Sequence, residues 1–293
     1  MDKPEWLEVS VEVDHETAEA VAEVISRYAH GGVVVEGGPH GWDAAPVVVR
    51  GYLPTDDDLW SRKKKIEEGL WHLGQIRRIP EPSFRPIAEQ DWADAWKKRL
   101  KVLHIGDRIV IRPSWLDYKP EYGEVVIDLD PGMAFGTGLH PTTQLCLRAL
   151  ETHLRPGLEV LDLGTGSGIL AIAAAKLGAE RVLALDNSQQ AVNVARGNVI
   201  GNAVEEHVRV RQGSLSDASG CYDLVLVNIL ARVIVDMADA GLSEKLRPGG
   251  VLITAGITVD QVSQVVAALE RGGLSLIDRR QRRDWVSLLA QRA

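Results

Sequence analysis

The sequence predicts an α/β protein whose larger domain contains a mostly parallel sheet and follows a small α+β domain. From about residue 142 onward, short continuous apolar runs alternate with helical patterns. Such runs are typical of parallel strands that helices cover on both faces. Before residue 82, the patterns follow the order βαββαβ, which is typical of a ferredoxin-like unit. A chain of 293 residues also has room for two domains.

The first domain is predicted over residues 1–82. Apolar and polar residues alternate over Leu7–Val13, which indicates a half-buried strand. Apolar positions then recur at helical spacing until Gly31 and Gly32 end that helix. The expected elements are a strand at Leu7–Val13, a helix over Ala18–Ala29, strands at Val33–Val35 and Val47–Val49, a helix over Asp56–Leu73 and a last strand that starts near Gln75.

Residues 83–100 are predicted to form a linker with a short helix. Three prolines fall within Pro80–Pro86, which is typical of a connecting segment. The pattern over Asp91–Leu100 indicates a short helix that carries Trp92 and Trp96. The main domain is therefore expected to occupy residues 101–293.

The main domain is expected to alternate helices and strands. Its last two strands are joined by a short polar turn, so they should be antiparallel. The expected strands are Ile109–Arg112, Glu124–Leu129, Val160–Leu163, Val182–Leu185, Val208–Arg211, Leu224–Val227, Val251–Thr254, Leu274–Ile277 and Trp285–Leu289. The expected helices are Thr142–Thr152, Ile169–Leu177, Ser188–Ile200 and Gln261–Glu270.

Composition and charge narrow the function classes. The sequence contains no apolar run long enough for a membrane span, and no signal peptide is expected. The two cysteines, Cys146 and Cys221, match no metal or redox spacing, which favours small core residues in a reducing cytoplasm. Residues 1–82 contain 16 acidic and 9 basic residues, a balance of −7. An acidic domain of this kind does not suit the binding of nucleic acid. Its charge could attract a basic partner, or it could serve only to keep the protein soluble.

The strongest motif is Val160–Gly168, with the sequence VLDLGTGSG. A buried strand ends there in a glycine-rich turn, and a helix begins. Glycine allows the backbone to bend and to approach a ligand closely, and the helix N-terminus offers unpaired N–H groups. Asp186 closes the next strand, where a carboxylate can bind both hydroxyls of a ribose.

The glycine spacing distinguishes the possible ligands of this turn. A dinucleotide site requires G-x-G-x-x-G, whereas Gly164, Gly166 and Gly168 are each two residues apart. Asp162 would also be unfavourable beside a pyrophosphate, but it suits the cationic end of S-adenosylmethionine (AdoMet). The turn is similar to the first motif of class I methyltransferases. A dinucleotide site and a purely structural turn remain the alternatives.

Two further segments carry candidate residues. The loop over residues 130–143, DPGMAFGTGLHPTT, is rich in glycine and could fold over a cofactor and exclude water. The alternative is a plain turn with a helix cap from Thr142 or Thr143. Asn228, in VNILA, ends the fourth strand of the sheet, at the edge where α/β folds bind ligands. The alternative role of Asn228 is a helix cap. Many methyltransferases that modify planar nitrogens have an Asn-Pro-Pro-aromatic motif at this position, and its absence here argues against a base or amide substrate.

Together, FGTGLHPTT, LDLGTGSG, Asp186 and VNILA closely resemble the PrmA-type methyltransferases, which modify large-subunit ribosomal protein number eleven. Their order and spacing agree from about Phe84 to Trp285. The resemblance implies a Rossmann-like class I methyltransferase domain with a mostly parallel seven-stranded sheet. It also implies a cytoplasmic monomer, an N-terminal substrate-recognition domain, and trimethylation of lysine and N-terminal α-amines of a basic ribosomal protein. Neither direct nucleic acid binding nor a metal is expected.

The resemblance also implies a set of cofactor contacts. The positions that match the family's contacts are Thr143, Gly164, Asp186 and Asn228, with Phe135 and Gly136 in the loop that flanks the cofactor. Asp162 and Gly166 complete the expected AdoMet site. Ser214 departs from the pattern, because many class I enzymes have an acidic residue there.

The expected reaction is direct displacement, in which an amine nitrogen attacks the methyl group and S-adenosylhomocysteine leaves. Asn228 is the residue expected to orient the amine. Three rival functions share parts of this site: a methyltransferase for another amine, a non-catalytic AdoMet-binding regulator, and a dinucleotide oxidoreductase.

Overall fold

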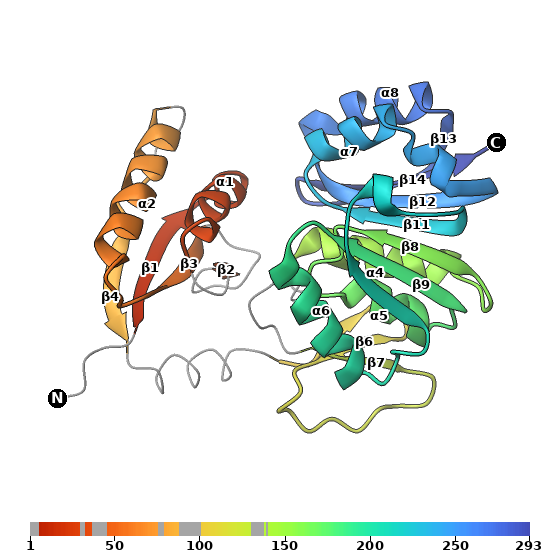
Figure 1. Cartoon of the computed structure of the whole chain (residues 1–293), viewed down its shortest axis with the longest axis horizontal. Coiled ribbons are helices and arrows are strands. Elements are labelled where there is room, and N and C mark those ends of the chain that lie inside the picture. The colour runs from red at the N-terminus through yellow and green to blue at the C-terminus, as the bar shows by residue number, and fades with distance from the viewer. Residues whose placement is uncertain are drawn as a thin grey trace. The chain divides into compact units, whose positions relative to one another are not determined.

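The computed structural model describes residues 6–29, 33–36, 46–75, 79–87, 101–129, 138 and 140–293. The chain divides into two compact units, residues 1–100 and 101–293, which are coloured from red to blue along the chain in Figure 1. Each unit has its own sheet and its own hydrophobic core. Among the described residues, no helix combines the length and the apolar character needed to cross a membrane.

The first unit has the predicted ferredoxin-like fold. Its four antiparallel strands lie in the order β2-β3-β1-β4, and buried valines of β1 and β3 pack against the apolar faces of the two helices. Asp14 begins the first helix, where its side chain accepts a hydrogen bond of 2.7 Å from the N–H of Thr17. The elements are β1 Trp6–Val13, α1 His15–Ser26, β2 Val33–Glu36, β3 Val47–Pro54, α2 Leu59–Gly74 and β4 Ser83–Ile87.

The last strand of this unit lies later than predicted. The strand expected near Gln75 is wrong, because Gln75 caps the C-terminus of α2 and β4 begins at Ser83. The first residues of the expected linker are therefore part of the sheet, where Pro86 lies opposite Leu7 of β1. Proline cannot donate to a sheet, but β4 is an edge strand with a free side. The helix expected at Asp91–Leu100 lies outside the described residues.

The second unit is built on a seven-stranded sheet in the order β10-β9-β8-β11-β12-β14-β13. The first five of these strands are parallel, and β14 is antiparallel to both β12 and β13, as the short turn predicted. The strands are β8 Glu159–Leu163, β9 Arg181–Asp186, β10 Val208–Gln212, β11 Tyr222–Asn228, β12 Leu246–Thr258, β13 Leu274–Arg282 and β14 Trp285–Arg292. A smaller sheet contains β5 Leu103–Ile105, β6 Ile109–Arg112 and β7 Val125–Asp128.

Helices cover both faces of the large sheet (Figure 1). One core cluster joins the sheet to α4, α5 and α6, and the other joins it to α7 and α8. Helix α5 is buried over nearly its whole length, which explains its almost uninterrupted apolar sequence. The sequence analysis missed α7. The helices are α4 Pro141–His153, α5 Ile169–Lys176, α6 Gln189–Gly201, α7 Ala231–Asp239 and α8 Val262–Arg271.

The strand order determines where the ligand crevice of an open α/β sheet is expected. Neighbouring strands β8 and β11 continue along the chain in opposite directions, β8 toward β9 and β11 toward β12. Their carboxyl ends therefore form a topological switch point, where open α/β sheets bind ligands. The glycine-rich turn follows β8, and Asn228 ends β11.

Candidate functional site

The turn after β8 depends on glycine. Gly164, Gly166 and Gly168 have φ angles of 72°, 56° and 84°, in the left-handed region that other residues rarely adopt. The N–H groups of Gly164 and Thr165 both donate to the carbonyl oxygen of Leu185, at 2.8 and 3.0 Å. The turn is thus held against the end of β9, with its backbone close to the crevice.

Asp186 joins the turn to the next helix. Its Oδ2 accepts a hydrogen bond of 2.9 Å from the N–H of Gly166, and its Oδ1 accepts one of 2.9 Å from the N–H of Ser188. The N-cap of α6 is Ser188, so Asp186 is not the cap of the helix that follows it. Each carboxylate oxygen can accept a second hydrogen bond, so Asp186 is able to bind two neighbouring hydroxyl groups.

Asp162 is a buried carboxyl group with one unsatisfied oxygen. It is 1% exposed, and its Oδ2 accepts a hydrogen bond of 2.6 Å from the Thr165 hydroxyl. Its Oδ1 makes no full hydrogen bond with the described residues, although the backbone N–H of Ala171 faces the carboxyl group closely enough to oppose the rise of its pKa. Burial raises the pKa of Asp162 from 3.8 to about 7, against the opposing effect of the Thr165 hydroxyl, and the charge of Asp186 raises it further. A cation beside Oδ1 would satisfy this oxygen and favour the ionised form.

Asn228 and Thr143 are far apart in the sequence but form a hydrogen bond with each other. The Nδ2 of Asn228, at the end of β11, donates to the Oγ1 of fully buried Thr143 in α4 at 3.4 Å. The N-cap of α4 is His140, so the suggested cap by Thr142 or Thr143 is wrong. The imidazole Nδ1 of His140 accepts from the N–H of Thr142 at 3.4 Å. The N-cap of α7 is Leu230, so Asn228 is not a helix cap either.

These candidate residues form two hydrogen-bonded groups at the carboxyl ends of the parallel strands. Hydrogen bonds join Gly166 to Asp186, and the turn residue Thr165 to Asp162; the second group is the Asn228–Thr143 pair. The remaining candidates, Phe135 and Gly136, lie outside the described residues.

Sequence reasoning missed three residues around this site. Asp217 lies three residues after Ser214, and its Oδ2 accepts from the N–H and hydroxyl of Ser214 at 2.8 and 3.1 Å. An acidic group is therefore present in the loop where the family pattern seemed to lack one. Ile229, directly after β11, lies against Gly164, and Gly256 of β12 lies against the backbone of Ile229. The sequence contains one signal for Gly256: it interrupts the apolar run of a strand, where glycine often marks a bulge or a close backbone contact.

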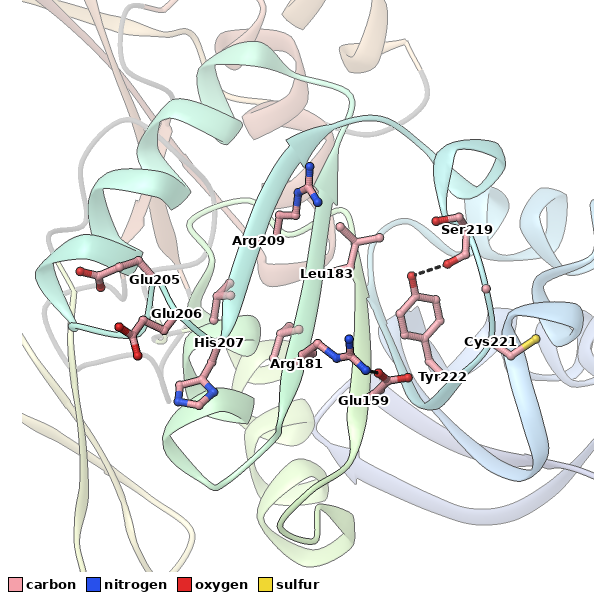
Figure 2. A pocket seen from close by; sticks show the side chains of 13 residues that line it. Glu159, Arg181, Leu183, Glu205, Glu206, His207, Arg209, Ser219, Cys221 and Tyr222 are labelled. Carbon is pink, nitrogen blue, oxygen red and sulfur yellow. Dashed lines mark hydrogen bonds and ion pairs between the residues drawn. The ribbon is translucent and has the colours of Figure 1, made fainter.

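A cavity of about 500 Å³ lies at the other edge of the sheet, away from these residues. Figure 2 shows Glu159, Arg181, His207, Arg209 and Tyr222 around it, at the amino ends of β8 to β11. None of the predicted site residues lines it. Its volume alone therefore gives no reason to move the site to this edge.

The fold and the first group of candidate residues define a class of protein. A switch point between β8 and β11, a glycine-rich turn after β8 and an acidic residue at the end of β9 are the parts of a Rossmann-like class I methyltransferase domain. The antiparallel β14 completes the seven-stranded sheet of that class.

Comparison with known proteins identifies the family. A model of the family "Ribosomal protein L11 methyltransferase (PrmA)" matches residues 5–293, so the chain belongs to the PrmA family. A ribosomal protein L11 methyltransferase from Chloroflexus aurantiacus is 46% identical over an alignment 330 positions long, which covers 100% of this chain and 99% of the relative. One from Herpetosiphon aurantiacus is 44% identical, over 97% of this chain and 98% of the relative. The crystal structure of the ribosomal protein L11 methylase from Lactobacillus delbrueckii subsp. bulgaricus is 35% identical, with a TM-score of 0.61, and covers 66% of this chain and 99% of that one.

Proposed function

We propose that this methyltransferase uses AdoMet to trimethylate lysine side chains and the N-terminal α-amine of ribosomal protein L11. Membership of the PrmA family supports the substrate. The observation that carries the cofactor is the unsatisfied, buried Oδ1 of Asp162 directly before the glycine-rich turn. Any hydrogen-bond donor would satisfy that oxygen, and a donor with a positive charge, such as the cationic end of AdoMet, would bind its ionised form more strongly than a neutral donor.

The residues present fit AdoMet along the whole crevice. Asp186 would bind the two ribose hydroxyls, and Gly164 and Gly166 would allow the backbone to approach the ligand. Asp162 would face the cationic end of the cofactor, and Thr143 would close the crevice from α4. Phe135 and Gly136 are proposed to flank the cofactor from their loop. When bound, AdoMet supplies a methyl group on a positively charged sulfur, with S-adenosylhomocysteine as the product.

Asn228 is proposed to orient the substrate amine. Its Nδ2 is used by Thr143, which leaves Oδ1 to accept a hydrogen bond from an N–H of the amine. That bond would point the nitrogen lone pair toward the methyl group. A lysine with an ordinary pKa of ~10.4 must first lose a proton, and a neighbouring positive charge lowers that pKa. Alignment of the two reacting atoms then provides much of the rate increase. Full turnover by Asn228→Ala at saturating substrate would refute this role.

The N-terminal unit is proposed to bind the protein substrate. Its residues 1–82 carry a balance of −7, which complements a basic ribosomal protein. Trp60 and Trp71 of α2 are 77% and 61% exposed, and their separation of three helical turns places them on one face. Ion pairs of 3.7 Å, Lys63 with Glu67 and Lys64 with Glu68, neutralise the neighbouring lysines of α2. Large exposed aromatic residues of this kind are typical anchors of protein interfaces.

Substrate binding by this unit has its own test. Trp60→Ala and Trp71→Ala should raise the KM for L11 and leave the affinity for AdoMet unchanged. The association should also weaken as salt rises from 0.05 to ~0.5 M. Salt-independent association would contradict the charge argument, and an unchanged KM in both variants would contradict the role of α2.

The mass of the product tests the function as a whole. The protein would be incubated with AdoMet and free L11, and the intact mass of L11 recorded. We expect increments of whole methyl groups, in threes at each modified amine, and peptide mapping would locate them. AdoMet binding without any increment would refute the substrate and favour another amine or a regulatory role. A cytoplasmic monomer is the proposed state, and sedimentation of the purified protein tests the monomer.

A further inference from the structure

Strand β12 has an irregularity directly beside Asn228. It pairs in parallel with β11 as far as Asn228, which lies opposite Ala255. On its other side, its antiparallel register with β14 shifts between Thr254 and Ile257. Gly256 lies within that shift and has a φ of 87°. A strand interior does not require a positive φ, so this bulge is a specific local feature.

The backbone of Ile229 lies directly on Gly256. A Cβ added to Gly256 would lie 2.0 Å from the carbonyl oxygen of Ile229, 2.7 Å from its carbonyl carbon and 3.2 Å from its nitrogen. The neighbouring Thr254 is fully buried, and its hydroxyl donates to the carbonyl oxygen of Val227 at 2.9 Å. Strand β12 therefore holds the residue before Asn228 by a hydrogen bond and the residue after it by close contact.

The side chain of Ile229 reaches the glycine-rich turn. Its Cγ2 lies 2.5 Å from the position of a Cβ on Gly164, the first glycine after β8. Ile229 is thus in contact with the turn through its side chain and with the β12 bulge through its backbone. No other described residue contacts both Gly164 and Gly256 so closely.

We propose that Gly256 and Ile229 are positioning residues that set the place of Asn228 relative to the turn that binds the cofactor. This inference rests on the proposed function, in which Asn228 accepts a hydrogen bond from the amine. A side chain at position 256 must displace the Ile229 backbone and with it the adjoining Asn228. The Asn228–Thr143 hydrogen bond is already 3.4 Å long, so a small displacement breaks it. Methyl transfer is sensitive to such a change, because a misplacement of 1 Å can reduce a rate ~100-fold.

A pair of glycines on β12 allows a matched experiment. Gly256→Ala and Gly249→Ala both place a side chain at a positive φ in the same strand. Only the first meets a neighbour, since nothing lies within 4 Å of a Cβ at Gly249. We expect Gly256→Ala to lower kcat ~30-fold or more and to change the dissociation constant of AdoMet less than ~3-fold. Gly249→Ala should retain both values. Equal kcat values in the two variants would overturn the proposal, as would equal losses of kcat and AdoMet affinity in Gly256→Ala.

A second experiment needs no turnover and remains informative if Gly256→Ala does not fold. Gly164→Ala should weaken AdoMet binding, partly because its Cβ meets the Ile229 Cγ2. Ile229→Ala removes that atom, so the double variant should recover at least ~3-fold of the lost affinity. Additive losses would refute the contact between Ile229 and the turn. Wild-type protein that binds AdoMet but does not methylate L11 would instead refute the proposed function and leave this coupling measurable.

Discussion

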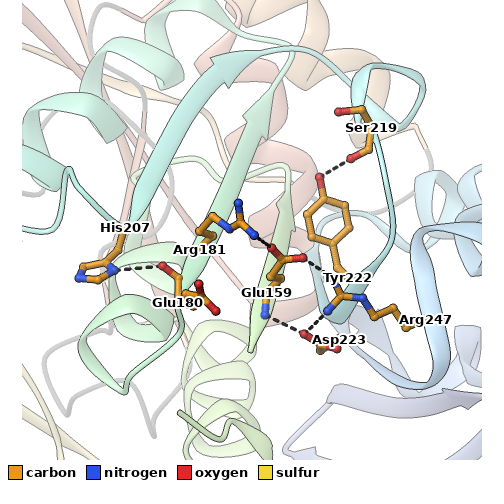
Figure 3. A network of polar contacts seen from close by, with 8 residues as sticks. All are labelled: Glu159, Glu180, Arg181, His207, Ser219, Tyr222, Asp223 and Arg247. Carbon is orange, nitrogen blue, oxygen red and sulfur yellow. Dashed lines mark hydrogen bonds and ion pairs between the residues drawn. The ribbon is translucent and has the colours of Figure 1, made fainter. Parts of the chain in front are cut away.

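Carboxylates at the two ends of the parallel strands of the seven-stranded sheet have different surroundings. The amino ends of these strands form the amino edge of the sheet, and their carboxyl ends form the carboxyl edge. At the amino edge, Glu159 accepts from the guanidinium groups of Arg181 and Arg247, as Figure 3 shows. Asp223 accepts from the N–H of Glu159 at 2.8 Å and from Arg247 at 2.6 Å. At the carboxyl edge, Asp162 is more deeply buried and one of its oxygens has no partner among the described residues. In the first arrangement the charges are paired, whereas the second leaves one carboxylate oxygen available for a further donor.

The pKa values of the two aspartates move in opposite directions for this reason. Burial alone would raise the pKa of Asp223, but the N–H of Glu159 and the Arg247 guanidinium bring it below its ordinary value. At Asp162 burial dominates and raises the pKa to about 7. The large cavity lies at the amino edge, where the charges are already paired. Unsatisfied polar groups and cavity volume therefore point to opposite ends of the parallel strands.

The largest expected effect comes from removing a carboxylate of the carboxyl edge. Asp186→Ala deletes the acceptor for the N–H groups of Gly166 and Ser188 and the proposed partner of the ribose. Two charge-assisted hydrogen bonds to a ligand correspond to a loss of ~100-fold or more in AdoMet affinity. Titration calorimetry measures that affinity. Asp223→Ala is the control at the amino edge and should change it less than ~2-fold. Similar losses in the two variants would abolish the distinction between the edges.

The pH dependence of AdoMet binding should report on Asp162. Below a pH of about 7 this group is protonated in the free protein, and a cation beside it favours the ionised form. Binding therefore releases a proton, and the affinity should rise ~10-fold or more between pH 5.5 and 7. Asp162→Asn, which cannot ionise, should show a nearly flat profile over this range. Parallel profiles for the two proteins would exclude Asp162 as the responsible group.

The same carboxyl group should reduce the stability of the free protein at high pH. Between pH 3.8 and about 7 the folded state holds a proton on Asp162 that the unfolded state has lost. The free energy of unfolding therefore falls as the pH rises through this range, by at most ~4 kcal/mol. Asp162→Asn should gain stability relative to wild type over that window, most at pH 8 and least at pH 4. Denaturant unfolding at both values measures the difference, and an equal difference at the two pH values would contradict the buried, unpaired state.

The sequence analysis selected the candidate site residues that local patterns indicate. Gly164 directly follows one strong apolar strand pattern, and Asp186 ends the next one. The carboxyl ends of parallel strands lie at the same edge of a sheet. The contact between Ile229, which directly follows β11, and Gly256 of β12 depends on a register shift that no local pattern reveals. The unsatisfied oxygen of Asp162 likewise depends on which groups the fold brings around it.

Two errors in the fold have different origins. Pro86 argues against a strand in any central position, and only the sheet order shows that β4 is an edge. At α4 the cap is His140 and not one of the two threonines that follow it, although threonine is the commoner cap. The first error required the sheet order for its correction, whereas the second concerned a local choice between neighbouring side chains.

The smallest expected effect comes from the amino edge. Arg247→Ala removes the guanidinium that Glu159 and Asp223 share, but Arg247 is 42% exposed and solvent screens the pair. We expect the Tm at pH 7 to fall by only ~2 °C, with kcat and AdoMet affinity unchanged. The difference should persist down to about pH 4, because the pKa of Asp223 lies below its ordinary 3.8 and the carboxylate stays charged. Arg209→Ala is a suitable control, since it lines the same cavity outside this network. A loss of activity in Arg247→Ala would show that the amino edge is coupled to the site and that the two edges are not independent.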